Sequence, residues 1–392
     1  MTITEKSICK FTAYFKMAGL YFHIPFCKQA CHYCDFHFST NLTESQSVVE
    51  SMGAELDLQK DYLRNQPVQT IYFGGGTPSL LSRNAIEGLT LKSKSVFTVT
   101  PDAEVTLEAN PDDLSPEKLE TLKGAGINRL SVGIQSFQDD LLKFLNRAHN
   151  SQLARECLEN IRRTGFNNIS IDLIYGIPAL SLDHWKETIA EAIRFSPEHI
   201  STYALTIEEK TVFGHWRKKG KLKAIDEETE ALQFELLMDM LGDAGYRQYE
   251  ISNFAKPGFI SRHNSSYWKQ SHYLGIGPSA HSYNGLSRQF NVRNNAQYVR
   301  SIQQGLVPFD REILSDENKI NEYLLTGLRT DWGCDLDFLR NVLKDDLLIR
   351  RGSYLNQILS QGLVSLEDKT LRLTRKGRLL ADKIAEDLIV AP

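Results

Sequence analysis

Three cysteines lie close together near the N-terminus of this 392-residue chain, in the segment Cys27-Lys-Gln-Ala-Cys31-His-Tyr-Cys34. Three thiolates at this spacing can bind three irons of a cubane iron–sulfur cluster, which leaves the fourth iron without a protein ligand. A cluster that only transfers electrons normally has four protein ligands. We therefore expect a second molecule to bind the fourth iron, so the segment indicates chemistry rather than a structural role.

A zinc site is the alternative interpretation of the same segment. Cys27, Cys31 and Cys34, together with His23 or His37, could form a structural site of the Cys3His type. Zinc would not explain the further polar and glycine residues described below, so we favour the cluster.

The cysteines must be positioned by the elements around them, and residues 20–208 indicate which elements these are. Short apolar segments alternate there with amphipathic segments, a pattern that predicts parallel strands joined by helices. Six strands are expected, at 20–24, 70–73, 104–108, 129–134, 169–175 and 199–206. The prediction is an α/β fold, a partial (β/α)6 TIM-like barrel that is two units short of closure.

Polar residues follow several of these strands, where sites form in parallel α/β folds. The cysteine segment follows the first strand, and Gly74-Gly75-Gly76-Thr77-Pro78 follows the second. Glycines allow the backbone to pass close to a ligand and to present its carbonyl groups. Later strands supply Glu108, Asn110, Gln135 and Asp172, and Arg147 lies one short helix further on. Each residue alone could be structural, but together they predict one ligand site.

The remaining chain predicts two further parts. Thr43-Glu-Ser-Gln46 is typical of a capping box that begins a helix reaching about residue 63, and Ser115-Pro116 is typical of a helix start. We expect a barrel at 17–225, an extension at 226–308 that is irregular and aromatic-rich over 246–298, and a C-terminal domain at 309–392. Helices around a hairpin at 362–374 make that domain winged-helix-like. Residues 1–16 show no clear period, and we expect a disordered extension from an upstream start codon.

Composition excludes several classes of function. Lys and Arg number 45 against 49 Asp and Glu, so no overall positive charge favours nucleic acid, and the C-terminal domain is itself nearly balanced. No segment approaches the roughly 18 apolar residues of a membrane span. Six cysteines without a signal peptide indicate the reducing cytoplasm.

The cysteine motif, with an aromatic at Tyr33, resembles the signature of radical S-adenosylmethionine (SAM) proteins, and the glycine segment resembles their SAM-binding motif. In that family the amino and carboxylate groups of SAM bind the fourth iron of a [4Fe-4S] cluster. An electron from the cluster, delivered by a donor protein, splits SAM into methionine and a 5′-deoxyadenosyl radical. The resemblance implies SAM contacts at Tyr21, Tyr33, Gly75, Gly76, Thr77, Glu108, Gln135, Arg147, Asp172 and, with a looser match, Ala204.

Further motifs narrow the resemblance to the branch that contains oxygen-independent coproporphyrinogen III oxidase and the HemW heme chaperones. These motifs are His23-Ile-Pro-Phe-Cys27, Ser131-Val-Gly-Ile-Gln135, Asp172-Leu-Ile-Tyr-Gly-Ile-Pro178 and Leu274-Gly-Ile-Gly-Pro-Ser-Ala-His281. The oxidases carry a fourth cysteine two residues after the third, and Phe36 occupies that position here. The oxidases also have a longer N-terminal extension. Both departures favour HemW.

The segment His263-Asn264-Ser-Ser-Tyr267-Trp268 is similar to the His-Asn-x-x-Tyr-Trp motif of the HemW family. A histidine can ligate heme iron, so the resemblance implies His263 as the ligand, with His272 and His281 as competitors. We expect a protein that binds a [4Fe-4S] cluster, SAM and heme, and that transfers heme to acceptors such as respiratory hemoproteins. The alternative is an enzyme that decarboxylates coproporphyrinogen III.

Overall fold

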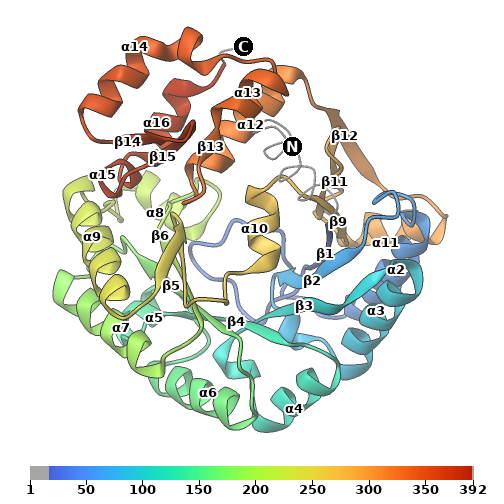
Figure 1. Ribbon diagram of the computed structural model, residues 1–392. Helices are drawn as coiled ribbons and strands as arrows, with labels where there is room; N and C mark the ends of the chain where they lie inside the picture. The colour runs from blue at the N-terminus through green and yellow to red at the C-terminus, as the bar shows by residue number, and fades with distance from the viewer. Residues whose placement is uncertain (1–16, 391–392) are drawn as a thin grey trace.

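Six parallel strands, arranged in the same order as in the sequence, form the centre of the molecule (Figure 1). The computed structural model describes residues 17–390, so the prediction for residues 1–16 lies outside the described residues. All six predicted strands are confirmed. They are β1 (Ala18–Ile24), β2 (Val68–Gly75), β3 (Val99–Ala109), β4 (Arg129–Gln135), β5 (Ile169–Tyr175) and β6 (His199–Ala204).

Helices connect these strands and cover the outer face of the curved sheet, which gives the predicted partial barrel (Figure 1). Strand β1 shows why the strands are almost wholly apolar, since Leu20, Phe22 and Ile24 are fully buried. The connecting helices are α2 (Ser45–Leu58), α3 (Arg83–Val96), α4 (Pro116–Gly124), α5 (Asp139–Phe144), α6 (Ser151–Arg163) and α7 (Leu182–Phe195).

Short strands extend the sheet at both edges. On one side β9 (His272–Ile276) pairs parallel with β1, and β10 (His281–Tyr283), β11 (Ser287–Asn291) and β12 (Phe309–Ile313) follow antiparallel. On the other side β8 (Asn253–Ala255) pairs with β6, and β7 (Arg247–Glu250) lies outside it. The expectation that residues 246–298 are irregular is therefore wrong, because pairing with distant strands orders segments too short to show a period of their own.

Four helices lie between β6 and β12 in the chain, and the last three fall within the predicted extension. They are α8 (Val212–Lys218), α9 (Glu227–Asp243), α10 (Arg262–Trp268) and α11 (Asn295–Gln303). Helix α10 carries the predicted heme motif, and Figure 1 shows it in the space that the curved sheet encloses. It packs against β1 and β2, so the motif comes close to the first two strands of the barrel.

One of the two predicted helix starts is correct. Ser115 caps α4, and its hydroxyl accepts a hydrogen bond from the Lys118 N–H at 3.2 Å. The capping box at Thr43 is wrong, because the Thr43 hydroxyl donates to the Asn41 side chain at 2.9 Å and α2 begins at Ser45 without a side-chain cap. Helix α2 also ends earlier than expected, at Leu58, and a series of turns follows it.

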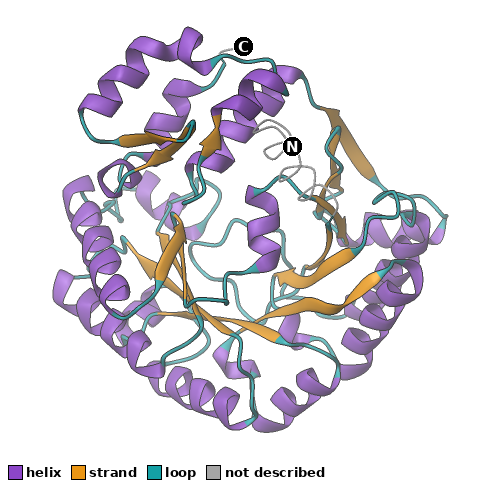
Figure 2. Ribbon diagram, in the orientation of Figure 1, coloured by secondary structure: helices purple, strands orange, loops and turns teal. Residues whose placement is uncertain are grey.

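The C-terminal domain has its own hydrophobic core and a small three-stranded sheet surrounded by helices (Figure 2). The predicted hairpin is formed by β14 (Val364–Glu367) and β15 (Thr370–Leu373), and β13 (Cys334–Asp335) pairs with β15. The helices are α12 (Asp316–Leu328), α13 (Leu336–Asn341), α14 (Leu347–Ser360), α15 (Arg375–Arg378) and α16 (Ala381–Leu388). Across residues 17–390, every helix is too short or too polar to span a bilayer.

Candidate functional site

A cavity of about 630 Å³ opens at the carboxyl ends of the six central strands; we refer to it as the first cavity. All three cysteines of the N-terminal motif line it. Nine of the ten predicted SAM contacts also line it, namely Tyr33, Gly75, Gly76, Thr77, Glu108, Gln135, Arg147, Asp172 and Ala204. The parallel register explains this convergence, since strands that begin at one edge of the sheet end together at the other.

The glycine segment is held by its own amide groups. The Gly75 N–H donates to Glu108 Oε2 at 3.0 Å, the Gly76 N–H to the Ile24 carbonyl at 2.8 Å and the Thr77 N–H to the Phe26 carbonyl at 2.7 Å. With these three donors occupied, the segment can offer a ligand its carbonyl oxygens and the Thr77 hydroxyl. Such groups suit the ammonium of an amino acid.

The glycines also allow two backbone segments to pack closely, a role that the sequence did not reveal. A Cβ on Gly76 would lie 2.6 Å from the Phe26 carbonyl oxygen and 2.8 Å from that of Ile24. Gly75 has φ +105°, and a Cβ there would lie 2.7 Å from the His23 ring. Both glycines are therefore required to bring the cysteine segment against β2, in addition to any contact with a ligand.

Two half-buried carboxylates give the first cavity its negative character. Glu108 accepts hydrogen bonds from the Tyr72 hydroxyl at 2.8 Å and from Gly75, yet burial raises its pKa to about 7. Burial likewise raises the pKa of Asp172 to about 6, and the Ser131 hydroxyl donates to it at 3.3 Å. A cationic ligand would stabilise the ionised form of both groups, which fits the positive charges of SAM.

Arg147 connects the cysteine segment to the barrel. Its guanidinium donates to Cys31 Sγ at 3.3 Å and to the Tyr33 hydroxyl at 3.4 Å, while its second amino group donates to the Gly133 carbonyl at 2.9 Å. Burial raises the pKa of Cys34 to about 11 and raises that of Cys27 as well. A cationic side chain and a metal are what such thiols require to become thiolates.

Gln135 occupies an unusual backbone position at the end of β4. Its φ is +65°, in the left-handed region that residues other than glycine rarely adopt, and it is 9% exposed. Strained residues of this kind gather at functional sites because the surrounding structure holds them in place. The strain supports a role for Gln135 in binding.

The geometry bears on the zinc alternative. Within residues 17–390, no three His, Cys, Asp or Glu side chains gather around one point as a single metal ion requires. A cubane cluster makes a different demand, because each of its three thiolates binds a different iron. All three cysteines line one cavity, as binding to a single cluster requires.

Two predicted site residues lie elsewhere. Tyr21 lines a neighbouring cavity of about 550 Å³, the second cavity, and its hydroxyl contacts His23 Nδ1 at 3.2 Å. His263 is 1% exposed and lines neither cavity; Nδ1 contacts the Thr70 hydroxyl at 2.7 Å and Nε2 the Tyr267 hydroxyl at 2.8 Å. Both ring nitrogens are therefore occupied, and iron ligation would require breaking one of these bonds. Of its competitors, His281 lines the second cavity and His272 does not.

The first cavity also contains residues that were not predicted as contacts. Asn110, which the sequence placed in the ligand site but not among the SAM contacts, accepts a hydrogen bond from Arg147 at 2.5 Å and donates to Thr77 at 3.3 Å. Tyr203 precedes Ala204 at the end of β6, and its place at the end of a strand could have indicated it. Phe38 lies in the loop after the cysteines, and no sequence signal marks it.

Comparisons with known proteins identify the superfamily and the fold. Residues 21–192 match the Radical SAM superfamily, and residues 314–380 match the HemN C-terminal domain. The structure of coproporphyrinogen III oxidase (HemN) from Escherichia coli, a radical SAM enzyme, shares the fold. Its TM-score is 0.82 over 98% of this chain and 93% of that chain, at 22% sequence identity.

Relatives that match nearly the whole chain identify a narrower family within this superfamily. The heme chaperone HemW of Bacillus subtilis is 38% identical over 376 residues, which are 94% of this chain and 98% of that protein. HemW of Mycobacterium tuberculosis is 34% identical over 95% of this chain and 94% of its own length. The mitochondrial radical S-adenosyl methionine domain-containing protein 1 of Bos taurus is 31% identical over 95% of this chain and 87% of its own length. The chain therefore belongs to the HemW family of the radical SAM superfamily.

Proposed function

We propose that this protein is a heme chaperone that binds a [4Fe-4S] cluster and SAM, holds heme and transfers it to acceptor hemoproteins. The observation that carries the proposal is the match to HemW of Bacillus subtilis over 98% of that protein. It is supported by the first cavity, which is lined by the three cysteines and by nine of the ten residues that the resemblance implies as SAM contacts.

The residues of the first cavity fit the two cofactors. Cys27, Cys31 and Cys34 would hold the cluster, and the glycine segment with Glu108 and Asp172 would hold SAM. When bound, the cluster supplies one-electron chemistry. Arg147 keeps the cysteine segment against the barrel.

Cluster binding is tested by anaerobic reconstitution of the full chain, followed by iron and sulfide analysis. Cys31→Ala should abolish the visible absorbance of the cluster and any SAM cleavage. The matched control is Cys157→Ala, which removes a buried thiol on α6, far from the motif in sequence, and should retain both. One zinc ion per chain without iron or sulfide would refute the cluster.

Heme transfer is tested with heme-loaded protein and the apo form of a respiratory hemoprotein. Transfer should be faster than the release of heme to excess apomyoglobin, which reports passive dissociation. Equal rates would contradict a chaperone role. The same preparation is incubated anaerobically with SAM and coproporphyrinogen III, since efficient decarboxylation would show that the oxidase activity is the correct one.

A further inference from the structure

The second cavity lies directly beside the first one and has a different chemical character. Asp35 and Phe36, which follow the cysteine segment, line both cavities, so this short loop is a shared wall. The volume of about 550 Å³ is in the range of small-molecule sites, roughly 300–1,000 Å³. Six aromatic side chains line it, namely Tyr21, Phe36, Tyr267, Trp268, Tyr273 and Tyr283. Such a lining suits a large, flat, apolar ligand.

Three histidines line the second cavity, and they differ in what their nitrogens contact. His23 is 5% exposed, with Nε2 against the His37 carbonyl at 3.0 Å and Nδ1 against Tyr21. Nε2 of His37 contacts the Asn295 side-chain oxygen at 3.0 Å. Within residues 17–390, neither nitrogen of His281 has a hydrogen-bond partner, and its ring packs edge-on against Phe290 with centroids 4.7 Å apart. Among the described residues, His281 is therefore the one histidine of the three whose two ring nitrogens are both available to a metal, whereas His37 has only Nδ1 available.

Two arginines supply positive charge to the same cavity. Arg288 stacks over Tyr283 and is neutralised by Glu322, whose carboxylate lies 2.8 Å away. Arg293 donates to the main-chain carbonyl of Asp35 at 3.3 Å, and no carboxylate of the described residues lies within 4.0 Å of its guanidinium. Arg293 is therefore the cation that remains available to an anionic ligand.

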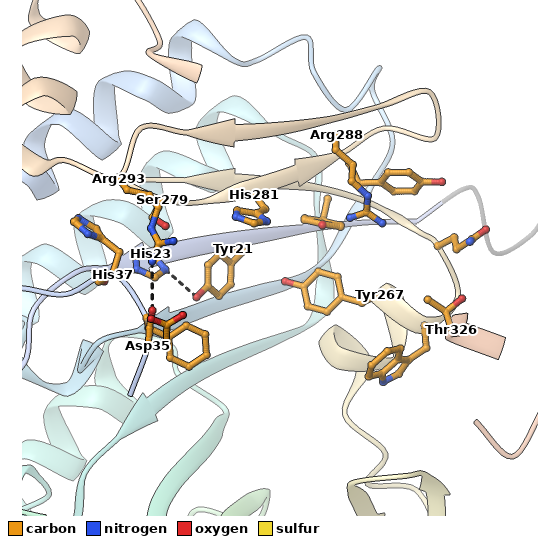
Figure 3. A pocket seen from close by; sticks show the side chains of 15 residues that line it. Tyr21, His23, Asp35, His37, Tyr267, Ser279, His281, Arg288, Arg293 and Thr326 are labelled. Atoms are coloured by element: carbon orange, nitrogen blue, oxygen red, sulfur yellow. Dashed lines mark hydrogen bonds between the residues drawn. The ribbon is translucent and has the colours of Figure 1, made fainter. Parts of the chain in front are cut away.

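Figure 3 shows how these groups are arranged around one space. His281, on β10, lies between the two arginines, with Tyr21 and Tyr267 below it in this view. A metal ligand, aromatic walls and an unpaired cation at the rim are the features that would recognise a flat metal complex with carboxylate groups.

We propose that heme binds in the second cavity, with His281 as an iron ligand and Arg293 paired with a propionate carboxylate. This inference rests on the proposed function and specifies its binding site. It also gives His263 a different role. His263 stands behind Tyr267 and positions that side chain as an aromatic wall, rather than reaching the iron itself.

The test compares heme titrations of the full, cluster-loaded chain and four variants, one of them a control. His281→Ala should weaken heme affinity by about 10- to 100-fold, because even residues that only orient a metal ligand contribute that much. The spectrum of a nitrogen-ligated ferric heme should be lost and should return when imidazole is added. His263→Ala should retain that spectrum. Arg293→Ala should weaken binding about threefold to fivefold, and the matched control Arg300→Ala, an exposed residue on α11, should not.

A chemical control isolates the propionate contact. Heme dimethyl ester has no carboxylates, so Arg293→Ala and wild type should bind it equally. The outcomes distinguish a failure of the proposed function from a failure of the proposed heme site. If the wild type binds no heme, the proposed function fails. If it binds heme and the His281 and Arg293 variants match it in affinity and spectrum, while His263→Ala loses the spectrum, the function stands and the second cavity is the wrong site. Loss of SAM binding in the His281 and Arg293 variants, with heme binding intact, would assign the second cavity to SAM instead.

Discussion

At the scale of single residues, the first cavity is built from groups whose charge state depends on the ligand. The carboxyl groups of Glu108 and Asp172 have pKa values of about 7 and 6 because burial destabilises their ionised forms. Each carboxylate would regain stabilisation from a cation placed beside it. Ligand binding and proton release are therefore linked.

The expected result is a pH-dependent affinity for SAM. A cationic ligand binds the ionised carboxylates, so affinity should fall as the pH decreases from 8 to 6, by about tenfold if one proton with a pKa near 7 is coupled. Isothermal titration in buffers of different ionisation enthalpy would measure the protons released. Glu108→Gln should flatten the profile. A flat profile in the wild type would contradict the assigned role.

The raised pKa of Glu108 has the opposite effect on the stability of the protein without SAM. An acid whose folded pKa is raised favours folding at low pH, so the contribution of Glu108 is present below about 4.5 and is lost as the pH rises through about 7. Urea unfolding across this range should show the loss, and added SAM should reverse it near neutral pH.

Gly76 provides a second residue-scale prediction. Gly76→Ala places a methyl group against the carbonyls of Phe26 and Ile24, so the free energy of unfolding should fall by about 1–3 kcal/mol. The control is Gly88→Ala on α3, where nothing lies within 4 Å of the added Cβ and stability should hold or rise by up to about 1 kcal/mol. Equal urea midpoints for the two variants would refute the close approach.

At the scale of elements, sequence patterns were reliable where a strand or helix carried its own signal. The six central strands are long, apolar and bounded by helices, so each was predictable alone. Strand β9 was not, because five residues pair with β1 across more than 240 positions of sequence. Site residues were likewise predictable only where they lie on elements that carry their own sequence signal. Residues at the ends of the central strands were assigned to one cavity, whereas the second cavity required the unpredicted strands β9 to β11.

Helix α2 holds that unpredicted region in place through one buried carboxylate. Glu55 is fully buried and accepts hydrogen bonds from the Gly277 N–H at 2.8 Å, the Asn291 side chain at 2.7 Å and the Tyr298 hydroxyl at 2.5 Å. These residues flank His281 on both sides in the sequence. Glu55 therefore connects the wall of the second cavity to the helical layer.

Glu55→Gln should loosen this wall. The amide replaces one acceptor oxygen by a donor, so at least one of the three donors loses its partner, and the free energy of unfolding should fall by about 1–3 kcal/mol. Hydrogen exchange should increase at the amides of residues 277–291. Glu50→Gln changes an exposed residue of the same helix and should leave both measurements unchanged. Unaltered exchange in Glu55→Gln would show that the wall is held by other contacts.

At the scale of the whole molecule, the C-terminal domain closes one side of the second cavity. Thr326 of α12 lines that cavity, and Glu322 of the same helix pairs with Arg288. The domain joins the barrel along β7, where the Ile251 N–H donates to the Arg329 carbonyl and the Asp331 N–H to the Tyr249 carbonyl, each at 3.0 Å. Arg247 and Asp331 form an ion pair across the same junction.

If heme binds in the second cavity, docking of the C-terminal domain and heme binding should be thermodynamically linked. Arg247→Glu replaces the ion pair with two like charges and should weaken docking by about 1 kcal/mol. Heme affinity should decrease. The absorbance of the cluster should remain, because it depends on the three cysteines that line the first cavity. The double variant Arg247→Glu, Asp331→Arg restores opposite charges and should recover most of the affinity. Hydrogen exchange at Ile251 and Asp331 should slow when heme is added to the wild type. If Arg247→Glu speeds exchange at these amides yet binds heme with wild-type affinity, the C-terminal domain does not contribute to closing the heme site.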